Sequence, residues 1–376
     1  MIRRALTSAA AVAAATGALA TAAQAAGPPL PKAANGKPVQ FVAGGVTTPT
    51  SFAFGGGAIF EGDGGSPPAS PGGVYLVKPG AAVRLPGSPG FVSGLAWRKG
   101  TLYVAGGNIG PNGSATFQIQ AWSGFNGATF AKQKAIYTAP KNFAGFNGLA
   151  FGPDGRLYIG IDVGLTNGND HGPARTPFVY DIISMNTKGK SVKVYAKGMR
   201  QPWQLAFAPG DSRPFVTDFG QDCTGPNPCP DTATPPAVPD FVLHVKAGDN
   251  YGFPKCNWAK GSSCKGFTTP FKQFAPHTDN GGIAIVGKTI YLGQFGFAAP
   301  AHKPQVVTMS LTGGKVKPFL TGSPVPIIAI GASGGFLYVG AAGQNPGEGF
   351  IYRVRLTTSS TPTPPSKPAT GPVFTG

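Results

Sequence analysis

One pattern of small and apolar residues recurs along the chain. A small residue, an apolar residue, an alanine and a second apolar residue are followed by a short turn and by a segment of the type LYVG. Clear copies are GLAW at 94–97 followed by TLYV at 101–104, and GLAF at 148–151 followed by RLYIG at 156–160. Each half of the pattern has the length and apolar character of a short buried strand. The Gly, Pro, Asp and Asn residues in between are typical of hairpin turns.

Six copies of this pattern predict the architecture. Their central alanines are Ala53, Ala96, Ala150, Ala206, Ala284 and Ala329. The intervals of 43 to 78 residues between them suit units of four short strands with their turns. We therefore predict an all-β, six-bladed β-propeller. Because a ring of blades must close to remove exposed strand edges, we expect the segment 349–356 to pair with strands from 39–63. The N- and C-terminal strands would then close the ring.

Composition supports this fold class and divides the chain. The 58 Gly and 39 Pro residues oppose long helices, and a hydrophobic content of 41% is sufficient for a packed interior. Arg3 and Arg4 precede an uncharged, Ala-rich run that ends in the small-x-small cleavage site AQA. We predict a signal peptide at 1–25, a propeller at 26–356 and a disordered Pro/Thr/Ser-rich tail at 357–376. A secreted or cell-envelope protein is expected, exported by the general secretory or the twin-arginine route, with no membrane span in the mature chain.

The charge balance is strongly basic. The chain has 31 Lys and Arg against 14 Asp and Glu, a formal net charge of +17. Nucleic acid is not an expected partner of an exported protein, whereas an anionic cell-surface polymer could be attracted to such a surface. The longest basic runs are only pairs, such as Arg98 with Lys99, which favours lysines scattered over loops for solubility.

All four cysteines lie between the fourth and fifth copies of the pattern. Four cysteines in an exported chain indicate two disulfides, and no C-x-x-C spacing points to a metal or redox site. The short separations favour the pairs Cys223–Cys229 and Cys256–Cys264, each closing a local loop. Crossed pairing between the two local pairs is the alternative. The surrounding segment, with a Pro-rich stretch at 226–239, is predicted to be a large loop insertion on one face.

Candidate chemistry is sparse in the motifs themselves. The chain has no G-x-S-x-G, no phosphate-binding loop and no H-E-x-x-H. Propellers usually place their sites on loops at one end of the central channel. Polar residues that end the strands of the repeated pattern point to that end, and they are Asp162, Asp218, Gln294 and Gln344. Each is more commonly a turn residue that satisfies backbone groups.

The most specific segment lies between 198 and 254. GMRQPWQLAF at 198–207 is similar to a G-x-R-N-P-x-G-L signature, with Gln201 in place of Asn. KAGDNYGFP at 246–254 is similar to a G-x-N-Y-G-W-P stretch, with Phe253 in place of Trp. PHT at 276–278 resembles an H-x-A-P-x-G element, and GFIYRV at 349–354 matches a closing strand. In these segments the chain resembles the soluble quinoprotein glucose/sorbosone dehydrogenase family, over most of the residues from 94 to 356.

The resemblance implies a site that holds pyrroloquinoline quinone over a calcium ion and oxidises an aldose or a related sugar. Arg200 would pair with the quinone's oxygens, and the other cofactor-binding residues would be Gln201, Gln204, Asn250 and Tyr251. Calcium prefers oxygen ligands, which the backbone carbonyls of Gly220 and Gln221, together with Asp218, would provide. His277 is the only candidate for a catalytic base that lies in a family-like motif.

One departure from the family concerns catalysis. The family's general base is a His seven residues before the Phe of FGPDG, and Ala144 occupies that position here. Removing a hydroxyl proton from a sugar needs a base, so dehydrogenase activity would be absent or weak. Two alternatives follow: a non-catalytic secreted propeller that binds carbohydrate or a cell-wall polymer, and a metal-dependent lactonase. The segment NGL at 147–149 resembles one ligand segment of the lactonases.

Overall fold

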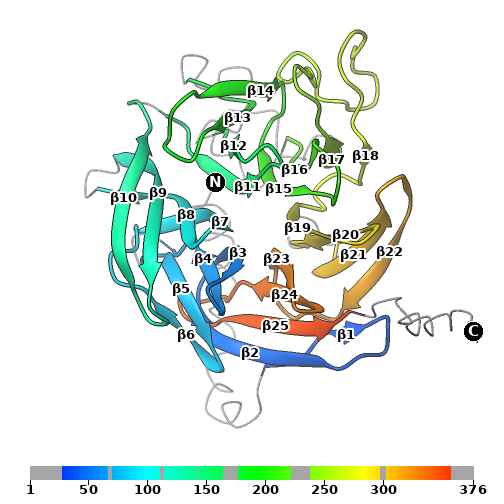
Figure 1. Ribbon diagram of the computed structural model, residues 1–376. Helices are drawn as coiled ribbons and strands as arrows, with labels where there is room; N and C mark the ends of the chain where they lie inside the picture. The colour runs from blue at the N-terminus through cyan, green and yellow to red at the C-terminus, as the bar shows by residue number, and fades with distance from the viewer. Residues whose placement is uncertain are drawn as a thin grey trace, which may run out of the picture.

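A ring of β-sheets surrounds a central axis (Figure 1). The computed structural model describes residues 28–66, 70–110, 114–141, 143–163, 177–221, 238–296 and 302–356. All regular elements within these ranges are strands. They accordingly contain no helix that is long and apolar enough to cross a membrane. The predicted all-β propeller is confirmed for the described part of the chain.

Four sheets are built from strands that follow one another in the chain. The first contains β7 (Phe91–Arg98), β8 (Thr101–Ile109), β9 (Ala115–Phe125) and β10 (Phe130–Thr138). The second contains β11 (Phe146–Phe151), β12 (Leu157–Ile161), β13 (Asp181–Met185) and β14 (Lys193–Lys197). The third contains β15 (Pro202–Phe207), β16 (Pro214–Asp218), β17 (Phe241–His244) and β18 (Lys272–Gln273). The fourth contains β19 (Asn280–Val286), β20 (Thr289–Gln294), β21 (Gln305–Ser310) and β22 (Gly313–Thr321), and β1 (Lys32–Ala33) is added at its edge.

The fifth sheet has eight strands and divides into two antiparallel halves. One half is β3 (Pro49–Gly55), β4 (Ala58–Asp63), β5 (Gly73–Lys78) and β6 (Gly80–Arg84). The other half is β23 (Ile327–Ser333), β24 (Phe336–Ala341), β25 (Gly349–Arg355) and β2 (Val39–Val46). Only a short parallel contact between β2 and β6 joins them. We interpret each half as one blade, in keeping with the predicted six-blade arrangement.

The two ends of the chain meet in the last of these units. β2 pairs antiparallel with β25, from Val39 opposite Val354 to Val46 opposite Gly349. The expected closure by N- and C-terminal strands is therefore present. The prediction placed too many N-terminal strands in this unit, because only β2 joins the C-terminal strands. After β2 the chain bends at Thr47 and Thr48 into the next unit, to which β3 and β4 belong.

The first half of the repeated pattern forms the innermost strand of each unit. These strands are β3, β7, β11, β15, β19 and β23, and each packs against the next around the axis. The packing explains the small first residue of the pattern. A Cβ on Gly148 would lie 2.5 Å from the Trp203 carbonyl oxygen of β15, and a Cβ on Gly94 would lie 2.8 Å from the Asn147 carbonyl oxygen of β11.

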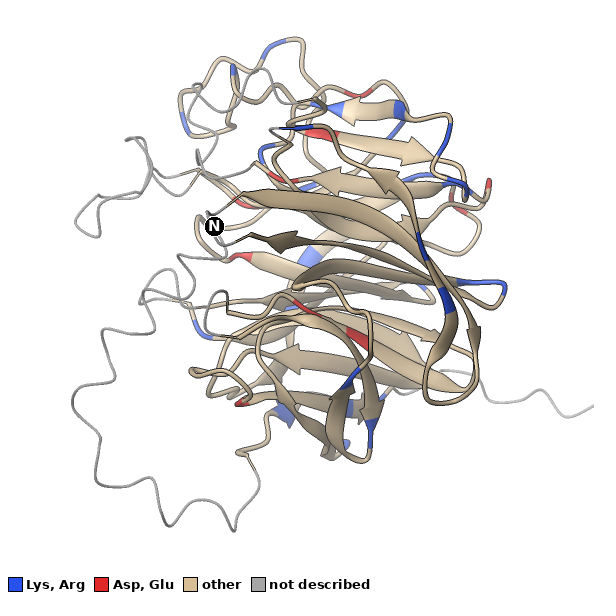
Figure 2. Cartoon of the chain, turned by 90° about the vertical axis from the view of Figure 1, so that its left-hand side faces the viewer, with Lys and Arg blue, Asp and Glu red and all other residues tan. Residues whose placement is uncertain are grey.

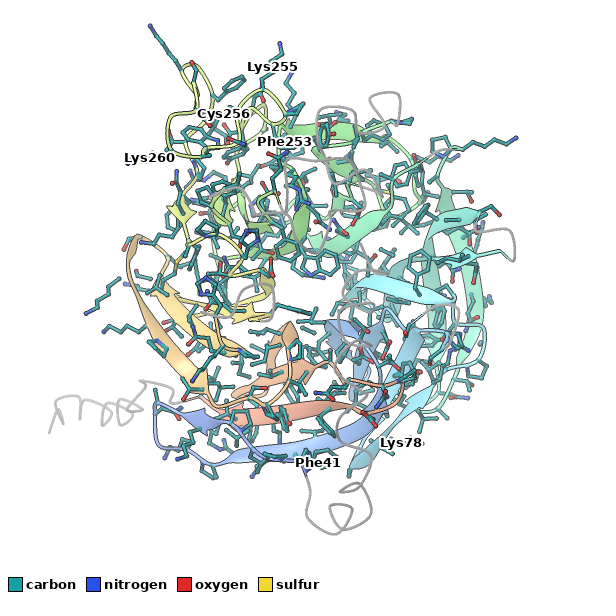
Figure 3. All side chains as sticks on the ribbon, turned by 180° about the vertical axis from the view of Figure 1, so that it is seen from behind. Phe41, Lys78, Phe253, Lys255, Cys256 and Lys260 are labelled. Carbon is teal, nitrogen blue, oxygen red and sulfur yellow. A yellow bond between two sulfur atoms is a disulfide. The ribbon has the colours of Figure 1, made fainter. Side chains whose placement is uncertain are left out.

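Apolar side chains fill the space between neighbouring units. One buried cluster combines Tyr158 of β12 with Leu205 and Val216 of β15 and β16. Lys and Arg positions, coloured blue in Figure 2, are scattered over strands and loops on the side that faces the viewer. The predicted Cys256–Cys264 disulfide is formed, with Cα atoms 5.3 Å apart, in the long connection between β17 and β18 that Figure 3 labels. Cys223 and Cys229 lie outside the described residues.

Candidate functional site

The residues of the 198–254 segment meet at one end of the third sheet. Arg200 and Gln201 lie just before β15, Asp218 ends β16, and Asp240 precedes β17. The loop that contains His277 leads into β19 of the next sheet. We call this group the β15–β17 site; it consists of Arg200, Gln201, Asp218, Gly220, Asp240 and His277. Consecutive strand ends bring these residues together although they are spread over some eighty positions in the sequence.

Arg200 is held inside the protein. The residue is only 2% exposed. Its guanidinium donates hydrogen bonds to the Gly220 carbonyl oxygen and to Gln201 Oε1. Asp218 lies beside it and accepts a hydrogen bond of 2.7 Å from the Gln201 backbone N–H. Burial raises the pKa of Asp218 to about 7, although the hydrogen bonds and the Arg200 charge act in the opposite direction. Asp218 can therefore accept or release a proton near neutral pH.

Asp240 connects the loops of the site through its hydrogen bonds. One carboxylate oxygen accepts from the Gly220 N–H at 2.7 Å, and the other accepts from the Asp279 N–H at 2.8 Å and from Thr278 Oγ1 at 3.0 Å. Burial raises its pKa, and the hydrogen bonds and the nearby His277 counteract part of that rise. The sequence segment around Asp240 was recognised, but nothing in it signalled that this carboxylate orders the loops before β17 and β19.

His277 has an unused nitrogen. Its Nε2 atom is buried and has no hydrogen-bond partner among the described residues. Its backbone is in the left-handed region, with φ of 61°, which is uncommon for a residue other than glycine and is often found at functional sites. A buried imidazole nitrogen without a hydrogen-bond partner destabilises the folded protein, unless a ligand or a water molecule supplies that partner.

The position of the family's missing base lies close to another carboxylate. Ala144 stands just before β11, and the carbonyl of the next residue, Gly145, accepts a hydrogen bond from the Asp162 N–H at 2.9 Å. Asp162 Oδ2 in turn accepts from Gln201 Nε2 at 3.2 Å. Asp162 thus joins the end of β12 to the β15–β17 site through this hydrogen bond.

Trp203 received no role from the sequence. Its ring stacks on Phe219, with ring centroids 5.5 Å apart and planes 27° apart. Its indole Nε1 is buried without a partner in the described residues. The one sign in the sequence was that this aromatic residue lies inside the most specific segment. Buried indole N–H groups usually have a hydrogen-bond partner, so an unpaired one is uncommon.

Other predicted site residues have structural partners. Gln204 donates to the carbonyl oxygens of Thr50 and Ser93, each at 3.0 Å, and so connects three inner strands across the axis. Asn250 Oδ1 accepts from the Gly252 N–H at 3.1 Å. Tyr251 is 3% exposed, and its hydroxyl donates to Asp249 at 3.3 Å.

Two of the three remaining polar residues, Gln294 and Asn147, reach the neighbours of the β15–β17 site through hydrogen bonds. Gln294 donates to Asn280 Oδ1 at 3.0 Å, and Gln344 is exposed in a turn after β24. Asn147, from the lactonase-like segment, donates to the Pro202 carbonyl at 3.0 Å and is 1% exposed. These residues connect neighbouring strands or end them.

One contact competes with the calcium and quinone site that the resemblance implied. The Gly220 carbonyl, an expected calcium ligand, already accepts the Arg200 guanidinium, so a calcium ion at that oxygen would face a positive charge. Within the described ranges, no group of three or more His, Cys, Asp or Glu side chains could hold a metal ion.

Comparisons with known proteins give a structural likeness without a sequence match. No family model matches the chain, and no curated protein sequence matches it. A solved glucose dehydrogenase is 17% identical, with a TM-score of 0.66 over 85% of this chain and 99% of that chain. The calcium structure of a Trichoderma reesei carbohydrate-active enzyme of family AA12 is 14% identical, with a TM-score of 0.67 over 88% and 98%. The holo form of the pyranose dehydrogenase PQQ domain from Coprinopsis cinerea is 12% identical, with a TM-score of 0.61 over 88% and 99%.

The likeness covers nearly the full length of each solved structure. At these identities it shows the fold. The matches support the resemblance to glucose/sorbosone dehydrogenases noted in the sequence, and the chain has the propeller fold of soluble sugar dehydrogenases.

Proposed function

We propose that this protein is an exported propeller that binds a small sugar at the β15–β17 site. The observation that carries the proposal is the buried His277 Nε2, which has no partner among the described residues and lies close to the Asp240 carboxylate. A sugar hydroxyl can both donate to and accept from an imidazole nitrogen, and so can complete it. The shared fold with sugar dehydrogenases supports the same ligand class.

The surroundings of His277 suit a neutral polyol. Asp240 is already satisfied by three donors, and Arg200 is committed to Gly220, so neither presents a free charge to a ligand. At the ends of β15 and β16, the stacked Trp203 and Phe219 add apolar ring surface and one N–H without a partner among the described residues. Ring faces with a few polar groups are the usual lining of a small-molecule site.

Calorimetric titration of the mature protein with aldoses, ketoses and their lactones tests the proposal. We expect binding of at least one sugar, weakened about tenfold or more in His277→Ala, because a buried partner would be lost. His302→Ala is the matched control and leaves the affinity unchanged. Trp203→Phe keeps the ring stack and removes only the N–H. The proposal fails if no sugar binds, or if His277→Ala binds every sugar as tightly as the unaltered protein.

Export is part of the proposal. The Arg3–Arg4 pair, the Ala-rich run and the AQA site support cleavage near Ala25. Mass spectrometry of protein recovered outside the cytoplasm should give a mature chain that begins at Ala26. Recovery of the uncleaved chain from the cytoplasm alone would contradict it.

Oxidation of an aldose with pyrroloquinoline quinone and calcium is the second candidate. The likeness to a holo quinone-binding domain favours it, whereas the Arg200–Gly220 contact and Ala144 oppose it. Adding the quinone and calcium to the protein, with absorbance and dye reduction as readouts, decides the question. A quinone spectrum together with sugar-dependent dye reduction would establish the second candidate. Ala144→His should then raise turnover, since a general base contributes roughly a hundred- to ten-thousand-fold.

A further inference from the structure

A second hollow lies on the outer side of the ring, far along the chain from the β15–β17 site. It has a volume of about 310 Å³ and is lined by Lys37, Pro38, Gln40, Phe336, Arg353 and Arg355. We call these six residues the cationic groove. They come from the segment before β2 and from β2, β24 and β25, the strands that close the ring (Figure 1). Figure 3 labels Phe41, the neighbour of Gln40, at the outer edge of the ring.

The two arginines of the groove are positioned by their neighbours. Arg353 and Arg355 are two residues apart on β25 and therefore point to the same face of the strand. Their guanidinium carbons lie 4.6 and 4.5 Å from the centroid of the Phe336 ring. Arg353 Nε also donates to Gln40 Oε1 at 2.8 Å. This contact and the ring restrict the guanidiniums before any ligand arrives, which lowers the entropic cost of binding.

No acidic residue neutralises the groove. In the described part of the chain, no carboxylate forms an ion pair with Lys37, Arg353 or Arg355. The stretch 28–46, which ends with β2, and the stretch 280–356 together contain eight Lys and Arg residues and one carboxylate. That carboxylate, Glu348, accepts the Asn345 N–H groups. Lys32, Lys315 and Lys317 are exposed on β1 and β22 and extend the positive charge beyond the groove.

We propose that the cationic groove binds an acidic polysaccharide through its carboxylate groups. Guanidiniums bind carboxylates with two parallel hydrogen bonds, which lysines cannot do. The exposed lysines on neighbouring strands suit a ligand that carries many charges along its length. Single-stranded nucleic acid is recognised by stacking of bases on aromatic rings. The aromatic ring that lines the groove, Phe336, is covered by guanidiniums, and the other lining residues are Lys, Pro, Gln and Arg.

The groove is independent of the proposed sugar site. It would tether the protein to an acidic polymer, whereas the β15–β17 site would take a single small sugar. Failure of sugar binding in His277→Ala therefore does not affect the groove, and loss of the groove leaves the small-sugar titration unchanged.

Fluorescence anisotropy with labelled polygalacturonate at low and moderate salt tests the groove. We expect binding that weakens with salt, because exposed charges are screened, and that falls at least tenfold in the double variant Arg353→Gln, Arg355→Gln. The matched control, Lys132→Gln with Lys134→Gln on exposed β10, removes the same charge elsewhere and should change affinity less than twofold. Gln40→Ala leaves β25 intact and should weaken binding two- to threefold through the loss of Arg353 orientation.

Three results would overturn the proposal. Equal weakening in the β10 control would mean that only net charge matters. Unchanged affinity in Arg353→Lys, Arg355→Lys would remove the role of the guanidinium plane. A DNA duplex that binds as tightly as polygalacturonate, or no binding of polygalacturonate at low salt, would exclude an acidic polysaccharide as the ligand of the groove. Neutral dextran should not bind.

Discussion

Arg200 shows how a residue in a recognised motif can serve the fold. Its guanidinium is bound to the Gly220 carbonyl and lies beside the buried Asp218. We predict that Arg200→Met lowers the ligand-free free energy of unfolding by about 3–5 kcal/mol, because a buried carbonyl and a buried carboxyl lose their cation. Urea unfolding measures the difference, and Arg213→Met at the exposed Asp211 pair is the control. An Arg200→Met variant as stable as the unaltered protein would assign this arginine to a ligand instead.

Glu61 is a buried carboxyl group outside the β15–β17 site. It lies on β4 opposite Phe52 and Tyr75, which belong to the apolar cluster between the first and last units of the ring. Neither carboxylate oxygen has a partner among the described residues. Burial, and to a lesser degree the charge of Asp63, raises its pKa well above the usual value.

The raised pKa of Glu61 gives a pH dependence of definite sign. The folded protein keeps the Glu61 proton at pH values where the unfolded chain has lost it, so the stability from this group is complete below the unfolded pKa and declines as pH rises toward the folded pKa. We predict that Glu61→Gln becomes progressively more stable than the unaltered protein as pH rises from 4 to 8. Thermal unfolding across this range measures the trend, with the exposed Glu348→Gln as control. A constant difference between the two proteins would contradict the prediction.

At the residue scale, the sequence identified positions better than roles. The segment 198–254 pointed to Arg200, Asp218 and Gly220, and the structure brings all three together. Motif spacing could not reveal that Arg200 already has its partner in the Gly220 carbonyl, because that contact depends on how the chain returns twenty residues later. The unpaired nitrogens of His277 and Trp203 could not be foreseen for the same reason, since the absence of a partner is a property of the packed loops.

Among the strands, the inner ring depends on residues without side chains. Gly148 on β11 approaches β15 so closely that a Cβ would lie 2.5 to 2.7 Å from atoms of Trp203 and Gln204. We predict that Gly148→Ala destabilises the protein by about 1–3 kcal/mol, because two inner strands must move apart. Gly44→Ala on β2 is the control, since its nearest contact would be an ordinary 3.6 Å. Chemical unfolding gives both values, and equal effects would contradict the packing argument.

The repeated pattern predicted the inner strands because it records their packing. Small residues mark close backbone approach, and alternating apolar residues mark the faces between units, so both are visible in the sequence. The long hairpin of β9 and β10 is half-exposed and falls outside the pattern. The prediction from sequence also assigned β3 and β4 to the closing unit. The bend at Thr47 and Thr48 directs the chain into the next unit instead, and no residue pattern marked that change of partner.

Integrity of the whole ring depends on β25. This strand has β24 on one side and β2 on the other, so removing it leaves two strand edges unpaired. We predict that a chain ending at Glu348 unfolds at much lower temperature and aggregates, whereas a chain ending at Leu356 retains the full melting temperature. Differential scanning calorimetry and light scattering compare the two. A stable, monomeric chain without β25 would show that the ring does not need this closure.

The pairing of Val39 with Val354 also sets the order of events during synthesis. β25 is synthesised after every other described strand, so β2 lacks its partner strand while the intervening strands are being synthesised. Contacts between such distant residues make folding slow, because the ends of a long chain must first meet. A nascent chain therefore cannot close the ring until translation is almost finished. The export proposed above is compatible with this delay, because the ring stays open until the C-terminal strand has been made.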